Sequence, residues 1–224
     1  MFDRLLKLIS KEDLEKINKV HVLLIGIGGV GGYALESMAR IGIQNITIVD
    51  NDIVDLSNLN RQIISLHSNI GETKVEVAKK RVLDINPNIN LNINNSFITK
   101  DNINSIITSD IDYIIDACDS VTTKVELIKI AQAKGIKIVS IMGTGNRLNP
   151  TMLEITDVYK TNYDPLAKVM RKLLRDNNIK KADVITSREM PIKTGSRTPG
   201  STSLVPSVAG IYATYYIIND ILKG

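Results

Sequence analysis

The chain has 224 residues, of which 43% are hydrophobic and 23% are charged, and it carries a net charge of +4. This composition is ordinary for a globular protein, and the length suffices to bury a full core. The charged first twenty residues lack the features of a secretion signal, and polar residues interrupt the apolar stretch from Leu204 to Leu222. The single cysteine, Cys118, excludes a disulfide framework and a multi-cysteine zinc site. We therefore expect a cytoplasmic protein that binds neither a membrane nor zinc.

The first part of the chain alternates strands and helices. We predict strands at 20–25, 46–49, 89–93, 113–117 and 136–141. We predict helices from the glycine turn to about Arg40, at 72–85 and at 121–134, the last two ended by Asn86-Pro87 and Gly135. Alternation of this kind with fully apolar strands is typical of a mostly parallel sheet covered on both faces. The predicted fold is therefore a doubly wound, Rossmann-like α/β fold.

The rhythm changes beyond Met142. We predict strands at 152–156 and 182–187, a helix at 164–176 and a mobile loop at 191–203. The last helix, from about Pro206, is apolar on nearly all sides, which predicts burial against the core or a second subunit. We expect one continuous domain over 1–224, with a nucleotide-binding core at 1–142 and a substrate-binding and dimerisation part at 143–224.

A glycine-rich turn stands between the first strand and its helix. Its glycines are Gly26, Gly28, Gly29, Gly31 and Gly32. Glycines there let the backbone approach a phosphate, and the helix N-terminus favours its negative charge. Asp50 ends the second strand, where an acidic side chain can bind ribose hydroxyls. These features predict nucleotide binding without saying which nucleotide.

The residues after Asp50 favour a triphosphate. Arg61 and Lys74 stand on either side of a short helix, and cations there can bind phosphates and stabilise a leaving pyrophosphate. Residues Asp116–Ser120 follow the fourth strand, at the carboxyl edge where ligands bind in open α/β sheets. A carboxylate in this segment can hold a magnesium ion that bridges the phosphates.

These motifs resemble the adenylation site of the ubiquitin-activating-type enzymes. The similar segments are 26–32, Asp50-x-Asp52, 56–62 (Leu-Ser-Asn-Leu-Asn-Arg-Gln), Lys74 and 116–120. The resemblance implies that ATP and Mg²⁺ are the cofactors. It implies that Asp50 binds the ribose within the Asp50-x-Asp52 motif, and that Asn58, Arg61 and Lys74 contact phosphates. It also implies that Asp119 holds magnesium and that Arg4 reaches the ATP of a partner subunit, whereas residues alone also allow Arg4 to be a solvated helix charge.

The rest of the chain resembles the threonylcarbamoyladenosine dehydratase branch of that superfamily. The similar segments are 142–151, 157–161, 164–171 and 198–210, of which Asp164-Pro165-Leu166-Ala167-Lys168 is the most specific. This resemblance implies a tRNA substrate: ATP activates the threonine-derived carboxylate of the modified adenosine beside the anticodon, and the side chain cyclises with loss of water. Some relatives carry a cysteine where this chain has Asp164, so a thiol step at that position has no support here.

Basic residues gather in the C-terminal part. They are Lys168, Arg171, Lys172 and Arg175 on the predicted helix, followed by Lys193 and Arg197 in the loop. The pattern alone fits a solvated helix face equally well. The resemblance favours contacts with the phosphate backbone of tRNA. Arg4 and the apolar last helix together lead us to expect a C2 homodimer.

Three functions remain open from the sequence. The first is the tRNA-modifying enzyme, and the second is an activator of a ubiquitin-like sulfur-carrier protein, which shares the ATP site. The missing zinc cysteines and the dehydratase-like C-terminal part disfavour the second. The third is a NAD-dependent dehydrogenase or a silent nucleotide-binding module, which Arg61 and Lys74 disfavour. Cys118, flanked by two aspartates, is expected to be a small core residue with a raised thiol pKa.

Overall fold

The computed structural model describes residues 1–223, so Gly224, the last residue of the predicted C-terminal part, lies outside it. The strands are β1 (His21–Ile25), β2 (Asn45–Val49), β3 (Asn90–Asn94), β4 (Tyr113–Asp116), β5 (Lys137–Ile141), β6 (Leu153–Asp157) and β7 (Asp183–Ser187). The helices are α1 (Lys11–Lys19), α2 (Gly31–Ile41), α3 (Lys74–Ile85), α4 (Ile103–Ile106), α5 (Val121–Lys134), α6 (Pro165–Asp176) and α7 (Leu204–Lys223).

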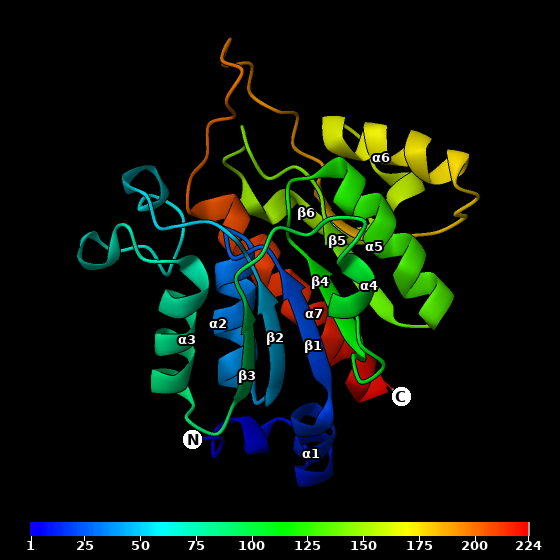
Figure 1. Ribbon diagram of the computed structural model, residues 1–224. Coiled ribbons are helices and arrows are strands. Elements are labelled where there is room, and N and C mark those ends of the chain that lie inside the picture. Colours follow the sequence, from blue (N-terminus) through cyan, green and yellow to red (C-terminus); the bar gives the residue numbers. More distant parts are fainter. Residues whose placement is uncertain (224) are drawn as a thin grey trace.

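The strands form one seven-stranded sheet in the order β3-β2-β1-β4-β5-β7-β6 (Figure 1). Neighbouring strands are parallel except β6, which runs antiparallel to β7. The predicted mostly parallel, doubly wound α/β fold is therefore confirmed. The chain order of the strands reverses between β1 and β4, and ligands of such sheets bind beside the carboxyl ends of strands at this point.

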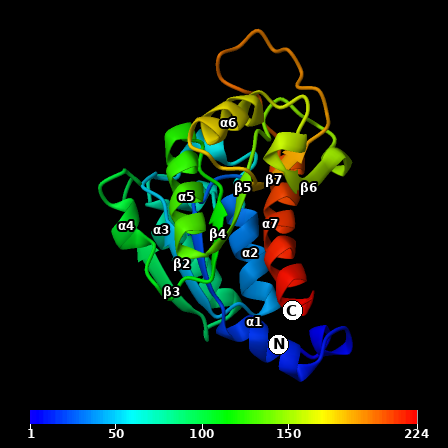
Figure 2. The ribbon, with the colours of Figure 1, turned by 90° about the vertical axis from the view of Figure 1, so that its right-hand side faces the viewer.

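Helices cover both faces of the sheet, and each face has its own hydrophobic cluster (Figure 2). One cluster joins the sheet to α2, α3 and α7, and the other joins it to α4, α5 and α6. The buried strands β1 and β4 have every residue covered, as expected of strands between two helical layers. The two layers leave the loops at the carboxyl edge of the sheet free to form a site.

Helix α7 packs against α2 directly behind the glycine turn. A Cβ atom on Gly210 would lie 2.3 Å from the Val30 carbonyl oxygen, so the two backbones meet without a side chain between them. Thr214 Oγ1 donates a hydrogen bond to the Ala34 carbonyl oxygen in the same contact. The last helix therefore braces the first turn of α2.

Within one chain, helix α7 is buried against the core on part of its surface. Its inner face is buried, but one stripe remains exposed, formed by Leu204, Ile211, Tyr215 and Leu222. An apolar sequence on every side gives no periodic signal, so the sequence did not separate the two faces. The helix also begins at Leu204, two residues before the predicted Pro206, because proline is compatible with the first turn of a helix.

The other differences from the predicted elements are small. Helix α3 begins at Lys74 and not at residue 72, with Thr73 as its N-cap residue, and β3 is shifted by one residue. Helix α1, which was not predicted, begins after Ser10, whose side chain accepts a hydrogen bond from the Asp13 amide. Within residues 1–223, no helix is both long and apolar enough to cross a membrane.

Candidate functional site

The glycine turn follows β1 and presses against the segment that follows β4. A Cβ atom on Gly31 would lie 1.8 Å from the Gly26 carbonyl oxygen, and one on Gly26 would lie 2.8 Å from that of Ala117. Gly26 also has a φ of +86°, which side chains disfavour. Only glycine therefore allows this close approach, which leaves the first amides of α2 facing the carboxyl edge of the sheet.

Asp50 connects the end of β2 to the glycine turn. Its Oδ2 accepts a hydrogen bond from the Ile27 amide at 2.6 Å, and its Oδ1 accepts one from the Asp52 amide at 2.8 Å. A carboxylate has about four acceptor positions, so Asp50 retains capacity for further donors such as ribose hydroxyls. Asp50 thus holds the turn in place and faces the cleft described next.

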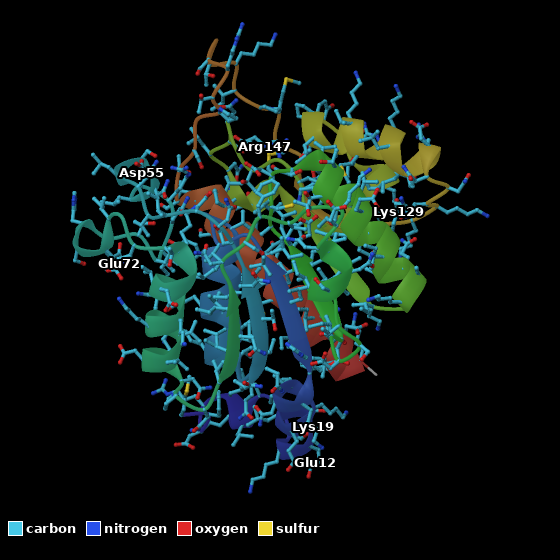
Figure 3. All side chains as sticks on the ribbon, in the orientation of Figure 1. Glu12, Lys19, Asp55, Glu72, Lys129 and Arg147 are labelled. Atoms are coloured by element: carbon cyan, nitrogen blue, oxygen red, sulfur yellow. The ribbon has the colours of Figure 1, made fainter. Side chains whose placement is uncertain are left out.

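A cleft of about 670 Å³ opens where the strand order reverses. The predicted residues that line it are Gly26, Gly28, Gly29, Asp50, Asp52, Asn58, Arg61, Lys74 and Asp119. They come from the ends of β1, β2 and β4, from the loop around 56–62 and from the start of α3. Figure 3 shows Asp55 and Glu72 on the loops beside this edge, whereas Glu12 and Lys19 of α1 lie at the opposite edge.

Two of the residues predicted for the nucleotide site do not line the cleft. Gly31 acts behind it, through its contact with Gly26. Arg4 is exposed and precedes the short helix η1 (Leu5–Lys7), which lies with α1 at the amino edge of the sheet (Figure 1). Arg4 therefore lies away from the cleft of its own chain.

The cationic side chains of the cleft are held by neighbouring groups. Lys74 is buried, and its Nζ lies 2.7 Å from Asp52 Oδ2. Arg61 donates to the Asn60 side-chain oxygen at 3.0 Å. Asn58 is 8% exposed, and its side-chain oxygen accepts a hydrogen bond from the Asp55 amide. The site therefore offers two cations and a buried amide on the side facing the glycine turn.

Asp119 has the donor chemistry expected for Mg²⁺. It is exposed at the cleft, whereas Asp116, three residues earlier, is buried in an ion pair. Residues 1–223 contain no group of three or more His, Cys, Asp or Glu arranged to hold a metal. Mg²⁺ needs no such cage, because one or two carboxylates together with substrate phosphates and waters suffice. The donor set therefore fits a magnesium ion bound with a nucleotide.

A buried ion pair fixes the turn that carries Asp119. Lys124 and Asp116 are both 0% exposed, and Lys124 Nζ lies 3.1 Å from Asp116 Oδ2. Asp116 Oδ1 accepts hydrogen bonds from the amide and the thiol of Cys118. Burial and the Asp116 charge raise the pKa of the Cys118 thiol, as predicted. No motif in the sequence marks Lys124, because its partner lies eight positions earlier in a strand.

The cleft also contains residues that the sequence analysis did not select. Phe97, which is 61% exposed, lines the cleft after β3 together with the buried Ile98. Gln62 is 6% exposed, and its side-chain oxygen has no hydrogen-bond partner among the described residues. Gln62 belongs to the quoted 56–62 motif, which is the signal that identifies it. No sequence motif marks Phe97 or Ile98.

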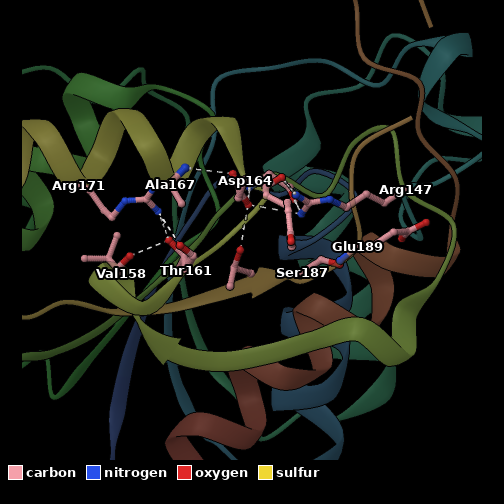
Figure 4. Close-up of polar contacts among 11 residues, drawn as sticks. Arg147, Val158, Thr161, Asp164, Ala167, Arg171, Ser187 and Glu189 are labelled. Carbon is pink, nitrogen blue, oxygen red and sulfur yellow. Dashed lines mark hydrogen bonds and ion pairs between the residues drawn. The ribbon is translucent and has the colours of Figure 1, made fainter. Parts of the chain in front are cut away.

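A second buried network joins the loop after β5, the start of α6 and strand β7 (Figure 4). Asp164, 3% exposed, accepts hydrogen bonds from the Gly143 and Ala167 amides and from the Thr186 hydroxyl. Arg147, 2% exposed, pairs with Asp164 and also donates to the carbonyl oxygens of Gly143 and Tyr163. Asp164 therefore both caps α6 and holds the loop that leaves β5.

The predicted loop at 191–203 is irregular and is attached to this region at Asn146. The Asn146 amide donates to the Gly200 carbonyl oxygen at 2.7 Å, and the Gly200 amide donates to the Asn146 side chain at 2.6 Å. The Ile192 amide donates to the Asn146 carbonyl oxygen at 2.8 Å. Lys193 and Arg197 lie in this loop and are exposed.

The predicted basic residues of α6 divide into two pairs. Lys168 and Lys172 are exposed. Arg171 donates to the backbone and hydroxyl oxygens of Thr161, and Arg175 lies over the Tyr159 ring at 5.3 Å from its centroid. The two lysines are therefore free to meet a polyanion, whereas both arginines also serve the packing of their own chain.

Comparisons with known proteins agree with this geometry. The chain matches the model of the ThiF family over residues 2–217. It is 37% identical to a tRNA threonylcarbamoyladenosine dehydratase of Bacillus subtilis, over 96% of this chain and 92% of that protein. It is 38% identical to the protein of the same name from Escherichia coli, where the alignment covers 76% of this chain and 64% of that one.

The structural comparison covers more of the Escherichia coli protein. The crystal structure of its tRNA N6-threonylcarbamoyladenosine dehydratase in complex with ATP superposes with a TM-score of 0.93 at 33% sequence identity. That superposition covers 99% of this chain and 93% of the other. The likeness thus extends through both the part that forms the cleft and the C-terminal part.

The buried pair below Asp119 leads to a prediction for stability. Replacing Lys124 with Met leaves the Asp116 carboxylate buried without its cation, and we expect a loss of about 3–5 kcal/mol in the free energy of unfolding. The double variant Asp116→Asn with Lys124→Met removes both charges and should recover much of this loss. Urea denaturation measures both variants.

The matched control is Lys137→Met, which removes the cation paired with Asp220. That pair is largely exposed, with side-chain exposures of 55% and 31%, so its loss should cost at most about 1 kcal/mol. Equal losses for Lys124→Met and Lys137→Met would show that the buried pair is not the stabilising element of the turn.

Proposed function

The chain belongs to the ThiF family, within its tRNA threonylcarbamoyladenosine dehydratase branch, and we propose that it catalyses ATP-dependent dehydration of threonylcarbamoyladenosine in tRNA. ATP activates the threonine-derived carboxylate as an acyl-adenylate, and the side chain then cyclises with net loss of water. The observation that carries this proposal is the cleft at the strand reversal, where a glycine turn, two cations and a carboxylate meet in a chain that is 37% identical to a dehydratase.

Each proposed role at the nucleotide is assigned to a side chain or a backbone amide that lines the cleft. Asp50 binds the ribose hydroxyls, with Asp52 beside it, and the amides at Gly28 and Gly29 approach the phosphates. Asn58, Arg61 and Lys74 bind the phosphates and stabilise the leaving pyrophosphate. The Lys74–Asp52 contact of 2.7 Å supports this role, because phosphates that approach can replace Asp52 as the partner of Lys74.

Phe97 and Gln62 extend the proposed site. The exposed ring of Phe97, beside Ile98, is suited to stack on the adenine base. The Gln62 side chain, with one buried polar atom unpaired, is suited to a hydrogen bond with the bound nucleotide. A magnesium ion held by Asp119 would supply charge neutralisation at the phosphates.

The alternative function is the activation of a ubiquitin-like sulfur carrier at the same cleft. That reaction needs the same nucleotide contacts, so the cleft alone does not separate the two functions. The dehydratase function is favoured because the match to the Bacillus subtilis dehydratase covers 96% of this chain, including its C-terminal part. We accordingly propose that 1–142 bind the nucleotide, that 143–224 serve tRNA binding and dimerisation, and that the enzyme acts in the cytoplasm.

We also propose a C2 homodimer in which α7 forms part of the interface. The exposed stripe of Leu204, Ile211, Tyr215 and Leu222 is the apolar surface that a second subunit would cover. Arg4, which does not line the cleft of its own chain, would cross to the partner's phosphates. In a C2 dimer this exchange occurs twice, so each site is completed by the other subunit.

The first prediction for this function concerns phosphate chemistry. Arg61→Ala, Lys74→Ala and Asp119→Ala should each slow the formation of AMP and pyrophosphate by about a hundredfold or more, because each removes charge stabilisation from the transition state. The control is Lys80→Ala, an exposed lysine of α3 paired with Glu72, which should keep the wild-type rate. Wild-type rates in all three site variants would refute the assignment.

The second prediction concerns Arg4 and is made by mixing subunits. Arg4→Ala and Asp119→Ala homodimers should each be nearly inactive. If Arg4 acts in the partner's site, the mixed dimer contains one complete site, and random mixing should restore about a quarter of the wild-type activity. Light scattering should give the dimer mass throughout. A monomeric mass at concentrations where the enzyme is active would contradict the proposed dimer. No restoration of activity on mixing the two variants would contradict the exchange of Arg4 between subunits.

The third prediction concerns tRNA. The double variant Lys168→Ala with Lys172→Ala should weaken tRNA binding and flatten its log–log salt dependence by up to about two units, one for each lost phosphate contact. ATP binding should not change. Lys16→Ala with Lys19→Ala, on α1 at the opposite edge of the sheet, is the control and should behave as wild type. An unchanged salt slope in the α6 variant would mean that these lysines are only solvated.

A further inference from the structure

Tyr163 has a backbone conformation that its own side chain disfavours. Its φ is +56°, in the left-handed region. The other non-glycine residues with positive φ among residues 1–223 are Asn146 and Asn178, and asparagine tolerates this region well. A bulky aromatic residue there is an outlier, and such strain persists only where the surrounding structure enforces it.

The buried network next to Tyr163 enforces this conformation. Arg147 Nη2 donates to the Tyr163 carbonyl oxygen at 3.1 Å, and the following residue, Asp164, is held by four donors including Arg147. Both sides of the Tyr163 peptide are thus anchored in the interior. The ring receives little packing in return, because Tyr163 is 60% exposed. Packing within this chain therefore does not account for a tyrosine at this position.

The position of Tyr163 relates it to the cleft. In the pairing of β4 with β5, Asp116 lies opposite Ser140. Asp119 comes three residues after Asp116, and Gly143 comes three residues after Ser140, so the two residues follow neighbouring strands at the same level. Gly143 bonds to Asp164, the residue after Tyr163, at 3.1 Å. The loop that contains Gly143 is next to the turn that carries Asp119. Tyr163 is attached to this loop through its neighbour Asp164, which accepts the hydrogen bond from Gly143.

The segment that contains Tyr163 is rich in basic residues. Between Lys160 and Arg175 the one acidic residue is Asp164, and its charge is buried against Arg147. Lys160, Lys168 and Lys172 are exposed in the same segment. An exposed aromatic ring among cations is the combination with which proteins bind unpaired RNA bases, because the ring stacks on the base and the cations hold the backbone.

We propose that Tyr163 is a stacking platform for an unpaired base of the tRNA anticodon loop. The Arg147–Asp164 network presents the ring at the carboxyl edge, and the neighbouring lysines hold the phosphates on either side of the stacked base. This inference rests on the proposed tRNA substrate and adds a contact outside the nucleotide cleft. The stack positions the loop so that the modified adenosine beside it reaches the cleft.

Three substitutions separate stacking from folding. Tyr163→Phe keeps the ring and should bind an anticodon stem–loop RNA as wild type does. Tyr163→Ala and Tyr163→Gly lose the ring and should bind it roughly five- to a hundredfold more weakly, the range for one base–aromatic stack. Tyr163→Gly also relieves the backbone strain, so its melting temperature should equal or exceed that of Tyr163→Ala. Both variants then lose affinity alike, whereas their stabilities differ, so the loss of affinity is separated from folding.

Asn178→Gly is the matched control, since it relieves the same backbone conformation, φ +59°, without removing an aromatic ring. It should leave RNA affinity unchanged. Stem–loop RNAs carrying 2-aminopurine at single loop positions provide a direct readout, because stacking quenches the fluorescence of the probe. Wild-type protein should quench one loop position, and Tyr163→Ala should not.

The outcomes distinguish a failure of the proposed tRNA function from a failure of the stacking role of Tyr163. Failure of the wild-type protein to bind the stem–loop would remove the tRNA function itself. Binding by wild type with unchanged affinity and quenching in Tyr163→Ala would overturn the stacking role alone. A loss of affinity in Tyr163→Phe equal to that in Tyr163→Ala would also overturn it, because the ring is then not the contact.

Discussion

The site depends on backbone contact without side chains where the sheet reverses its strand order. Gly31 touches the Gly26 carbonyl oxygen, and Gly26 touches that of Ala117, at distances that a Cβ atom would not allow. On the other side of α2, Gly210 brings α7 against the Val30 carbonyl oxygen. The start of α2 is therefore enclosed from two sides by backbone, which fixes the direction in which its free amides point. A phosphate site built from amides needs this rigidity, because amides cannot be re-aimed by rotating a side chain.

Buried charges then hold the loops around that start. Lys124 with Asp116 holds the turn after β4, and Arg147 with Asp164 holds the loop after β5. Buried ion pairs are weak sources of net stability, because desolvation offsets their attraction. Their directional hydrogen bonds, however, define one arrangement of a segment that has no regular structure. Two neighbouring strands thus end in loops of defined shape. The first loop carries the exposed Asp119, and the second is hydrogen-bonded to the segment that carries the exposed Tyr163.

The sequence predicted what depends on local chemistry. The glycine turn, Asp50 and the Arg61–Lys74 pair stand in short motifs, and the apolar strands show the doubly wound sheet directly. It did not predict Lys124 or Arg147, because their partners lie 8 and 17 positions away and meet them only after folding. It did not predict Phe97 or Ile98 at the cleft, because the loop after β3 has no motif. It placed the α6 arginines among the residues expected to contact tRNA, and it did not indicate that Arg171 and Arg175 also contact Thr161 and Tyr159 of their own chain.

The distribution of charge is suited to a nucleotide in the cleft and to a much larger polyanion outside it. In the cleft the cations are few and held: Lys74 is buried against Asp52, and Arg61 is bonded to Asn60. Held cations meet phosphates in one geometry, which is what a transition state requires. On α6 and in the loop at 191–203, Lys168, Lys172, Lys193 and Arg197 are exposed. Exposed cations attract any phosphate backbone, so they contribute affinity but do not fix the position of the bound nucleic acid. Rigid contacts such as an anchored aromatic ring must then supply the register, and the buried network beneath Tyr163 is suited to provide one.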